Sequence, residues 1–139
     1  MDNDNKKSAG GKVPTDHQLT TNSFGTDLAG YVKTEQVAKS ISCQVVLYNN
    51  PKFTHFEMSK ELVVRLSEIE NINYYKDATG VTGNLVSIMN QCDIRIFSAS
   101  AHLPALVMML GGVGWMSGPS CLIPKTSVKL YELCKQKKW

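Results

Sequence analysis

A lysine and a tyrosine each end a short, mostly apolar run of this sequence. Lys76 follows residues 72–75, Ile-Asn-Tyr-Tyr, and precedes the turn-forming residues 77–80, Asp-Ala-Thr-Gly. Tyr48 ends an earlier run of the same shape, residues 44–48, and precedes Asn-Asn-Pro. Side chains at the carboxyl ends of parallel strands lie where α/β enzymes carry out their chemistry. At that edge an amine can act as a nucleophile and a phenol can transfer a proton.

Strand-like and helix-like segments alternate along the chain from residue 27 onward. Strands are expected at residues 44–48, 72–76, 94–98 and 113–117. Helices are expected at residues 27–41, 59–69, 83–91, 103–110 and 126–138, with Ser59 as an N-cap and Pro104 in a first turn. This alternation with short links predicts an α/β fold built of parallel βα units. Four such units make half of a (β/α)8 TIM barrel, although periodicity alone also allows a small doubly wound sheet.

The overall composition limits the domain count and the classes of partner. A chain of 139 residues holds one domain at most. The net charge is only +3, and most of the excess lies near the two ends, so no nucleic acid partner is expected. The sequence has no run of about eighteen apolar residues, and it begins without an apolar signal-peptide core. We therefore expect a cytoplasmic protein with no membrane partner.

The cysteines are spread singly along the chain, at Cys43, Cys92, Cys121 and Cys134. They form no Cys-x-x-Cys motif, and the sequence has no paired histidines. Zinc sites and disulfide frameworks need closer or regularly paired ligands. We therefore expect reduced thiols, most of them buried, and no metal site.

Four segments in the same order resemble the dihydrodipicolinate synthase and N-acetylneuraminate lyase family. Residues 45–51 read Val-Val-Leu-Tyr-Asn-Asn-Pro, and residues 75–80 read Tyr-Lys-Asp-Ala-Thr-Gly. Residues 97–99, Phe-Ser-Ala, and residues 110–117, Leu-Gly-Gly-Val-Gly-Trp-Met-Ser, resemble the seventh and eighth strands of that family. The resemblance implies a partial TIM barrel over residues 27–139, corresponding to strands five to eight. Residues 1–26, which are polar and turn-rich, are expected to be a disordered or non-homologous leader.

The family resemblance implies a class I lyase, an aldolase or dehydratase that acts on a 2-oxo acid such as pyruvate without a cofactor. Lys76 is then the nucleophile that forms a Schiff base, and Tyr48 is the general acid and base. The same resemblance places Thr79, Ser98, Ala99 and Met116 in the substrate site. Trp115 and Met116, in the segment that resembles strand eight, are expected to make the pocket wall bulkier than usual.

The neighbourhood of the first motif bears on the second substrate. By resemblance, the synthases hold the carboxylate of that substrate with an arginine beyond the Tyr-Asn-x-Pro strand. Residues 51–54 here read Pro-Lys-Phe-Thr and contain no arginine. Lys52 lacks the bidentate geometry of a guanidinium. A 2-oxo acid aldolase or dehydratase other than the synthase is therefore favoured.

Strands one to four of the family barrel have no counterpart in residues 1–43. The loop that holds the pyruvate carboxylate in the family is also absent there, and so is the second tyrosine of its synthases. An open half-barrel has two unpaired strand edges and an apolar inner face. Two interpretations follow. The chain is an active lyase that associates as a homo-oligomer, or it is a truncated, catalytically inactive remnant of the family.

Overall fold

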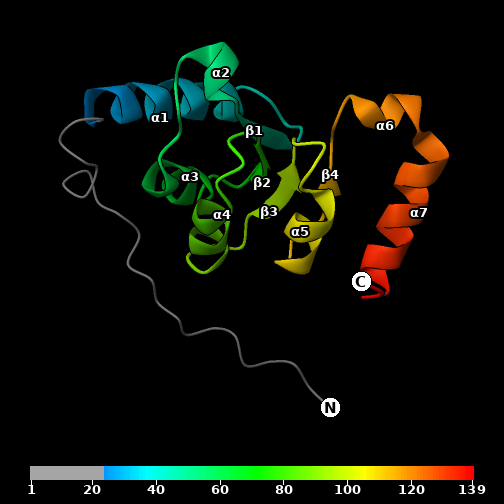
Figure 1. Cartoon of the computed structure of the whole chain (residues 1–139). Helices are drawn as coiled ribbons and strands as arrows, with labels where there is room; N and C mark the ends of the chain where they lie inside the picture. The colour runs from blue at the N-terminus through cyan, green and yellow to red at the C-terminus, as the bar shows by residue number, and fades with distance from the viewer. Residues whose placement is uncertain (1–23) are drawn as a thin grey trace.

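The computed structural model describes residues 24–139, with side chains from residue 29 onward. Its centre is a four-stranded parallel sheet in the order β1-β2-β3-β4, as Figure 1 shows. The strands are β1 (Val45–Asn49), β2 (Ile72–Asp77), β3 (Arg95–Ser98) and β4 (Gly114–Trp115). The α/β class and the order of parallel units are therefore as predicted. The fourth strand is much shorter than the expected residues 113–117.

Helices connect the strands, precede the first strand and follow the last one. The longer ones are α1 (Phe24–Lys39), α3 (Lys60–Leu66), α4 (Thr82–Met89), α5 (Pro104–Met109) and α7 (Pro124–Lys135). The Ser59 side chain accepts a hydrogen bond from the Leu62 amide at 3.1 Å, which confirms the predicted N-cap. Pro104 stands in the first turn of α5, also as predicted. The predicted leader reaches residue 26; α1 begins at Phe24, and residues 1–23 lie outside the described part of the chain.

Two one-turn helices were not predicted. They are α2 (Pro51–Thr54) and α6 (Pro119–Leu122), and each begins at a proline that directly follows a strand or its loop. Proline at the first position of a helix supplies a suitable φ and needs no hydrogen bond for its nitrogen. Both segments are too short for helical periodicity, so the sequence alone favours loops.

Strand alternation divides the sheet into a buried face and an open face. Leu47, Tyr75 and Ile96 point into the core, where they meet apolar side chains of α1, α3, α4 and α5. Tyr75 is only 2% exposed, whereas its neighbour Tyr74 lies on the opposite face. The two consecutive tyrosines of β2 therefore point in opposite directions, one into the core and one onto the open face.

The open face and both sheet edges lack a covering layer among the described residues. Strands β1 and β4 end the sheet, so each has one side with no described partner strand. Val46, Tyr48 and Met116 on the open face are substantially exposed. Unpaired edges and exposed apolar side chains favour association with another chain.

A tight glycine turn joins α5 to β4. Gly111 has a φ of +108°, a conformation that side-chain-bearing residues rarely adopt. A Cβ atom on Gly112 would lie 2.8 Å from the Val107 carbonyl oxygen and 3.1 Å from that of Ile96. The glycines therefore end the helix and allow close backbone packing.

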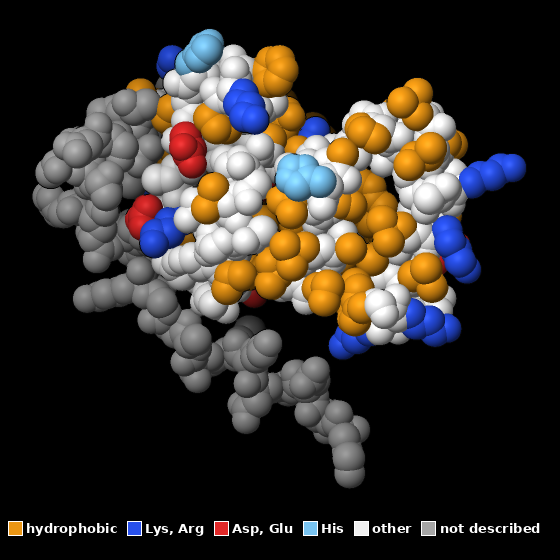
Figure 2. Space-filling model, viewed as in Figure 1, with side chains coloured by type: hydrophobic (Ala, Val, Ile, Leu, Met, Phe, Trp, Pro, Cys, Tyr) orange, Lys and Arg blue, Asp and Glu red, His pale blue; other side chains and the backbone are white. Residues whose placement is uncertain are grey.

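The last helix stands beyond β4 and leaves a hollow of about 350 Å³ beside the sheet edge. Phe97, Trp115, Val128 and Tyr131 contribute to its lining. Figure 2 shows hydrophobic side chains gathered over α5 and around this hollow, whereas lysines lie on the outer side of α7. Within residues 24–139, no helix is both long and apolar enough to cross a membrane.

Candidate functional site

The parallel register brings Lys76 and Tyr48 side by side. Tyr48 of β1 pairs with Lys76 of β2, which pairs in turn with Phe97 of β3. The Lys76 Nζ lies 4.0 Å from the centroid of the Tyr48 ring. An ammonium over an aromatic face is stabilised by the negative electrostatic potential of the ring. The two side chains picked out from the sequence therefore meet near the carboxyl ends of adjacent strands.

The Tyr48 hydroxyl is oriented by a neighbouring amide. Asn50 Nδ2 donates a hydrogen bond of 2.8 Å to the Tyr48 oxygen. Because the tyrosine oxygen is the acceptor, its own proton remains available for another group. Tyr48 is 42% exposed, so a small molecule at the open face can reach the hydroxyl.

A second cation lies on the same face of the sheet. Arg95 pairs in register with Tyr74, and its guanidinium carbon lies 4.1 Å from the Tyr74 ring centroid. The Tyr74 ring stacks on Phe97 at 5.7 Å between centroids. Among the described residues, no Asp or Glu forms an ion pair with Lys76 or Arg95. The open face therefore combines aromatic rings with two cations.

The loop after Lys76 is held by a buried carboxylate. Asp77 is 4% exposed and accepts hydrogen bonds from Thr79 Oγ1 at 2.9 Å and from the Gly80 amide at 3.1 Å. The Tyr75 hydroxyl donates a third, at 3.2 Å. Gly80 has a φ of +76°, which a glycine adopts at little cost. These bonds fix the backbone directly after the candidate nucleophile.

The same network ties β1 to β2. Asn49 Nδ2 donates to the Tyr75 oxygen at 2.8 Å, and Asn49 Oδ1 accepts from the Met58 amide at 3.1 Å. Burial, reinforced by the negative charge of Asp77, raises the pKa of the Tyr75 phenol. The phenol therefore stays protonated and serves as a structural hydrogen-bond donor beneath the sheet. This role cannot be predicted from the sequence, because nothing in it shows that Asn49 and Tyr75 meet.

The predicted substrate-binding residues have different environments. The Thr79 hydroxyl donates a hydrogen bond to Asp77, and the Ser98 hydroxyl is hydrogen-bonded to the Ser100 backbone at 3.2 Å. Because Ser98 pairs with Asp77, its side chain lies on the face opposite Lys76. The Ala99 amide donates a hydrogen bond to the Asp77 carbonyl at 2.7 Å, and the Met116 amide donates one to the Ser98 carbonyl at 2.8 Å. These two residues extend the strand ends toward the mouth of the sheet.

The prediction that Trp115 makes the pocket wall bulkier is wrong. Trp115 pairs with Ser98, so it lies on the face opposite Lys76. Its indole packs against Tyr131 of α7, with centroids 6.0 Å apart, and its Nε1 donates to Ser120 Oγ at 3.1 Å. Trp115 therefore anchors the last helices instead of lining the space around Lys76. Met116 alone of the two is exposed at the end of β4.

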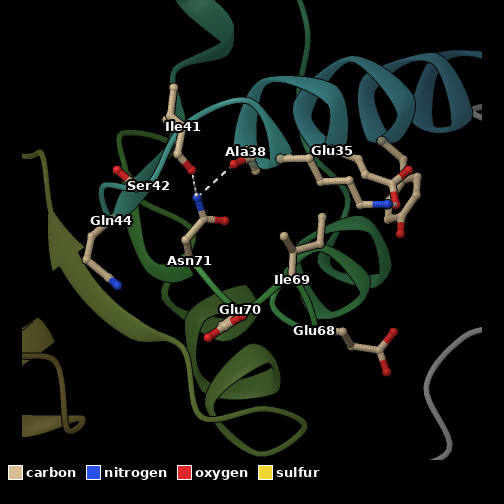
Figure 3. Close-up of a pocket in the computed structure, with 11 residues that line it drawn as sticks. Glu35, Ala38, Ile41, Ser42, Gln44, Glu68, Ile69, Glu70 and Asn71 are labelled. Carbon is tan, nitrogen blue, oxygen red and sulfur yellow. Dashed lines mark hydrogen bonds and ion pairs between the residues drawn. The ribbon is translucent and has the colours of Figure 1, made fainter.

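A hollow of about 620 Å³ lies at the amino-terminal end of the strands. Figure 3 shows Glu35, Glu68 and Glu70 around it. Asn71 at its centre donates to the carbonyls of Ala38 at 2.8 Å and Ile41 at 3.2 Å. Its amide thus ties the end of α1 and the following loop to the start of β2. This hollow lies at the opposite end of β2 from Lys76 and does not contribute to the candidate site.

Metal chemistry finds no support in the described side chains. Among residues 29–139, no three His, Cys, Asp or Glu side chains gather closely enough to hold a metal ion. The four cysteines are free thiols. The groups available at the open face are therefore an amine, a phenol, a guanidinium and backbone amides.

Relatives share both the fold and the sequence of this region. The crystal structure of dihydrodipicolinate synthase from Aquifex aeolicus matches with a TM-score of 0.78 and 24% identity, over 81% of this chain and 40% of that one. A 2-keto-3-deoxygluconate aldolase variant from Sulfolobus solfataricus matches with a TM-score of 0.70 and 19% identity, over 81% and 38%. The parallel sheet and its helices therefore have the fold of the matched part of a TIM barrel.

Curated proteins give the same result by sequence. The chain is 30% identical to the 4-hydroxy-tetrahydrodipicolinate synthase of Methanococcus aeolicus over 75% of its own length, and 33% identical to that of Brachyspira hyodysenteriae over 65%. It spans about a third of each relative, 36% and 31% respectively. The model of the dihydrodipicolinate synthetase family matches residues 26–138, and the chain therefore belongs to this family.

Proposed function

We propose that this chain is a Schiff-base lyase that acts on a 2-oxo acid such as pyruvate, without a metal or organic cofactor. The observation that carries the proposal is the Lys76 amine lying 4.0 Å from the Tyr48 ring centroid near the carboxyl ends of two parallel strands. Membership of the dihydrodipicolinate synthetase family supports a lyase of the pyruvate-dependent type. The proposed location is the cytoplasm.

Lys76 supplies the nucleophile in this proposal. The neutral amine attacks C2 of the oxo acid and forms a C–N bond, and the carbonyl oxygen leaves as water. The resulting iminium withdraws electrons from C3. A C3–H or C3–C4 bond can then break, leaving its electron pair in an enamine. Protonation of C3, or its attack on an aldehyde, consumes the enamine and regenerates the iminium, which water hydrolyses.

Tyr48 carries the protons of these steps. Its hydroxyl proton is not used in the bond with Asn50, so it is available to the leaving oxygen of C2. The phenolate that remains then accepts a proton from the substrate. A positioned general acid and base of this kind contributes roughly a hundred- to ten-thousandfold in rate.

The substrate is held, in this proposal, by the ends of β2, β3 and β4. Thr79 and Ser98 act by shaping the loops, since their hydroxyls are bonded to Asp77 and to the Ser100 backbone. Ala99 and Met116 stand at the strand ends. Lys52 lies exposed on α2 in place of the expected arginine, and this favours an aldolase or dehydratase of another 2-oxo acid over the synthase reaction.

A second copy of the chain completes the site in this proposal. Strands β1 and β4 are edges of one parallel sheet, so β4 of each copy can pair with β1 of the other and close a ring. The exposed open face then becomes the interior. Sedimentation equilibrium is expected to show a homo-oligomer with an even number of copies. A well-folded monomer at every concentration would contradict this assembly.

Proton exchange on pyruvate tests the proposed reaction and the role of Tyr48. In D₂O, an enamine formed on Lys76 exchanges the methyl protons of pyruvate for deuterium, which proton NMR follows as signal loss. Tyr48→Phe keeps the ring beside Lys76 but removes the transferable proton. We expect the exchange rate to fall by about a hundredfold or more.

Tyr131→Phe is the matched control, because this tyrosine lies on the last helix, where it packs against Trp115 and Lys135. It should exchange pyruvate protons at the rate of the unmodified chain. Equal exchange by the Tyr48 and Tyr131 variants would remove Tyr48 from the mechanism. A folded, unmodified chain with no exchange above the protein-free solution would mark an inactive member of the family.

A further inference from the structure

Arg95 is a charged residue at the open face for which sequence reasoning found no role. It lies at the start of β3, one strand away from Lys76 and two residues nearer the amino end, because Phe97 pairs with Lys76 and Arg95 with Tyr74. Both side chains leave the same face of the sheet. Strand spacing and rise put the two Cα atoms roughly 8 Å apart. Two long side chains at this separation can converge on one small anion.

The stacking of Arg95 leaves its hydrogen-bond donors available. The guanidinium lies with its carbon 4.1 Å from the Tyr74 ring centroid, and Phe97 stacks on the same ring with 5.7 Å between centroids. A guanidinium that stacks on a ring uses its flat face, while its N–H groups point outward in the plane. No described carboxylate forms an ion pair with it. A carboxylate can therefore bind the in-plane N–H groups in a bidentate manner.

We propose that Arg95 binds the carboxylate of the 2-oxo acid whose C2 carbon is bonded to Lys76. This inference rests on the proposed function, because it assigns the anion of the same substrate. In an α-oxo acid the carboxylate carbon, C1, is bonded directly to C2. An amine that attacks C2 and a guanidinium that binds the carboxylate must therefore lie on the same face of the sheet. Arg95 is a positioning residue: it selects 2-oxo acids over uncharged ketones and aldehydes and holds C2 against the Lys76 amine.

A charged and an uncharged substrate separate this role from a general effect on the fold. Pyruvate and methyl pyruvate present the same C2 carbonyl, but only pyruvate has a carboxylate. Each is incubated with the full chain and borohydride, and the reduced adduct is measured by intact mass as a function of concentration. In Arg95→Gln we expect half-maximal adduct formation to need about tenfold more pyruvate, the effect of losing a charge-assisted hydrogen bond. The methyl pyruvate curve should stay within about twofold, because an ester gives the guanidinium no full charge to bind.

Arg95→Lys and Arg65→Gln are the companion variants. Arg95→Lys retains the charge without the planar guanidinium, so its pyruvate curve should fall between those of the unmodified chain and Arg95→Gln. Arg65 of α3 lies over the Tyr31 ring at the same 4.1 Å, but in the helix layer, and its loss should leave both curves unchanged. An equal shift for both compounds, or no shift for either, would overturn the role of Arg95.

A binding measurement without chemistry distinguishes failure of this inference from failure of the Schiff-base proposal. Saturation-transfer NMR measures pyruvate binding to Lys76→Ala and to Lys76→Ala with Arg95→Gln. Binding that is lost only in the double variant supports Arg95 even if the unmodified chain forms no adduct, in which case the Schiff-base proposal alone fails. Equal binding by the two variants would overturn the Arg95 assignment whatever the adduct experiment gives.

Discussion

Lys76→Ala is expected to reduce the deuterium exchange of pyruvate to the rate of protein-free solution. The variant removes the amine that lies over the Tyr48 ring, and with it the iminium that makes the C3 protons acidic. A role that depends on a covalent intermediate leaves little residual rate when the nucleophile is deleted. Proton NMR of the methyl signal over time measures the effect.

The control for this variant is Lys129→Ala, which deletes an exposed amine from α7. Its exchange rate should equal that of the unmodified chain. Circular dichroism of both variants establishes that each retains its helices. Exchange that persists in a folded Lys76→Ala chain would mean that another amine, or simple buffer catalysis, acts on pyruvate.

Leu66→Ala is expected to lower the free energy of unfolding by about 3 kcal/mol, within the range for truncating a fully buried leucine. Leu66 ends α3 and is 0% exposed, in the layer that covers the sheet behind Lys76 and Tyr75. The lost methyl groups leave a void that close-packed neighbours fill only in part. Urea unfolding followed by circular dichroism gives the change in midpoint and slope.

Leu122→Ala makes the same chemical change at a side chain that is 85% exposed on α6. Surface substitutions of this kind usually change the unfolding free energy by less than about 0.5 kcal/mol. The pair therefore tests burial and not merely the loss of a leucine. Equal destabilisation by both variants would contradict the described helix layer.

The fold followed from the sequence wherever a pattern was long enough to repeat. Apolar runs before Tyr48 and before Lys76 located two strands, and the alternation of strands and helices predicted a parallel sheet. The family motifs then selected a TIM barrel over a doubly wound sheet. The short helices after Asn50 and Gly118 were missed, because a single turn has no periodicity.

The candidate site could be predicted only in part. Tyr48 and Lys76 each end an apolar run, which predicts that both lie at the carboxyl ends of strands, and they pair in register. The face on which the Trp115 side chain lies depends instead on the register of a two-residue strand, which no sequence pattern reveals. Arg95 was overlooked for a related reason: its place on the face of Lys76 follows from the pairing of β2 with β3. The bonds between Asn49, Tyr75 and Asp77 join two strands and are equally invisible in one sequence.

The most direct test of the central proposal is borohydride reduction of the unmodified chain in the presence of pyruvate, followed by peptide mapping. The Schiff-base mechanism predicts one stable adduct, located on Lys76 of β2 and absent when Lys76→Ala is treated in the same way. Other lysines, such as Lys52 and Lys129, should remain unmodified under conditions that saturate the site. A folded chain that yields no adduct, or adducts spread over several surface lysines, would contradict the assignment of Lys76 as the nucleophile.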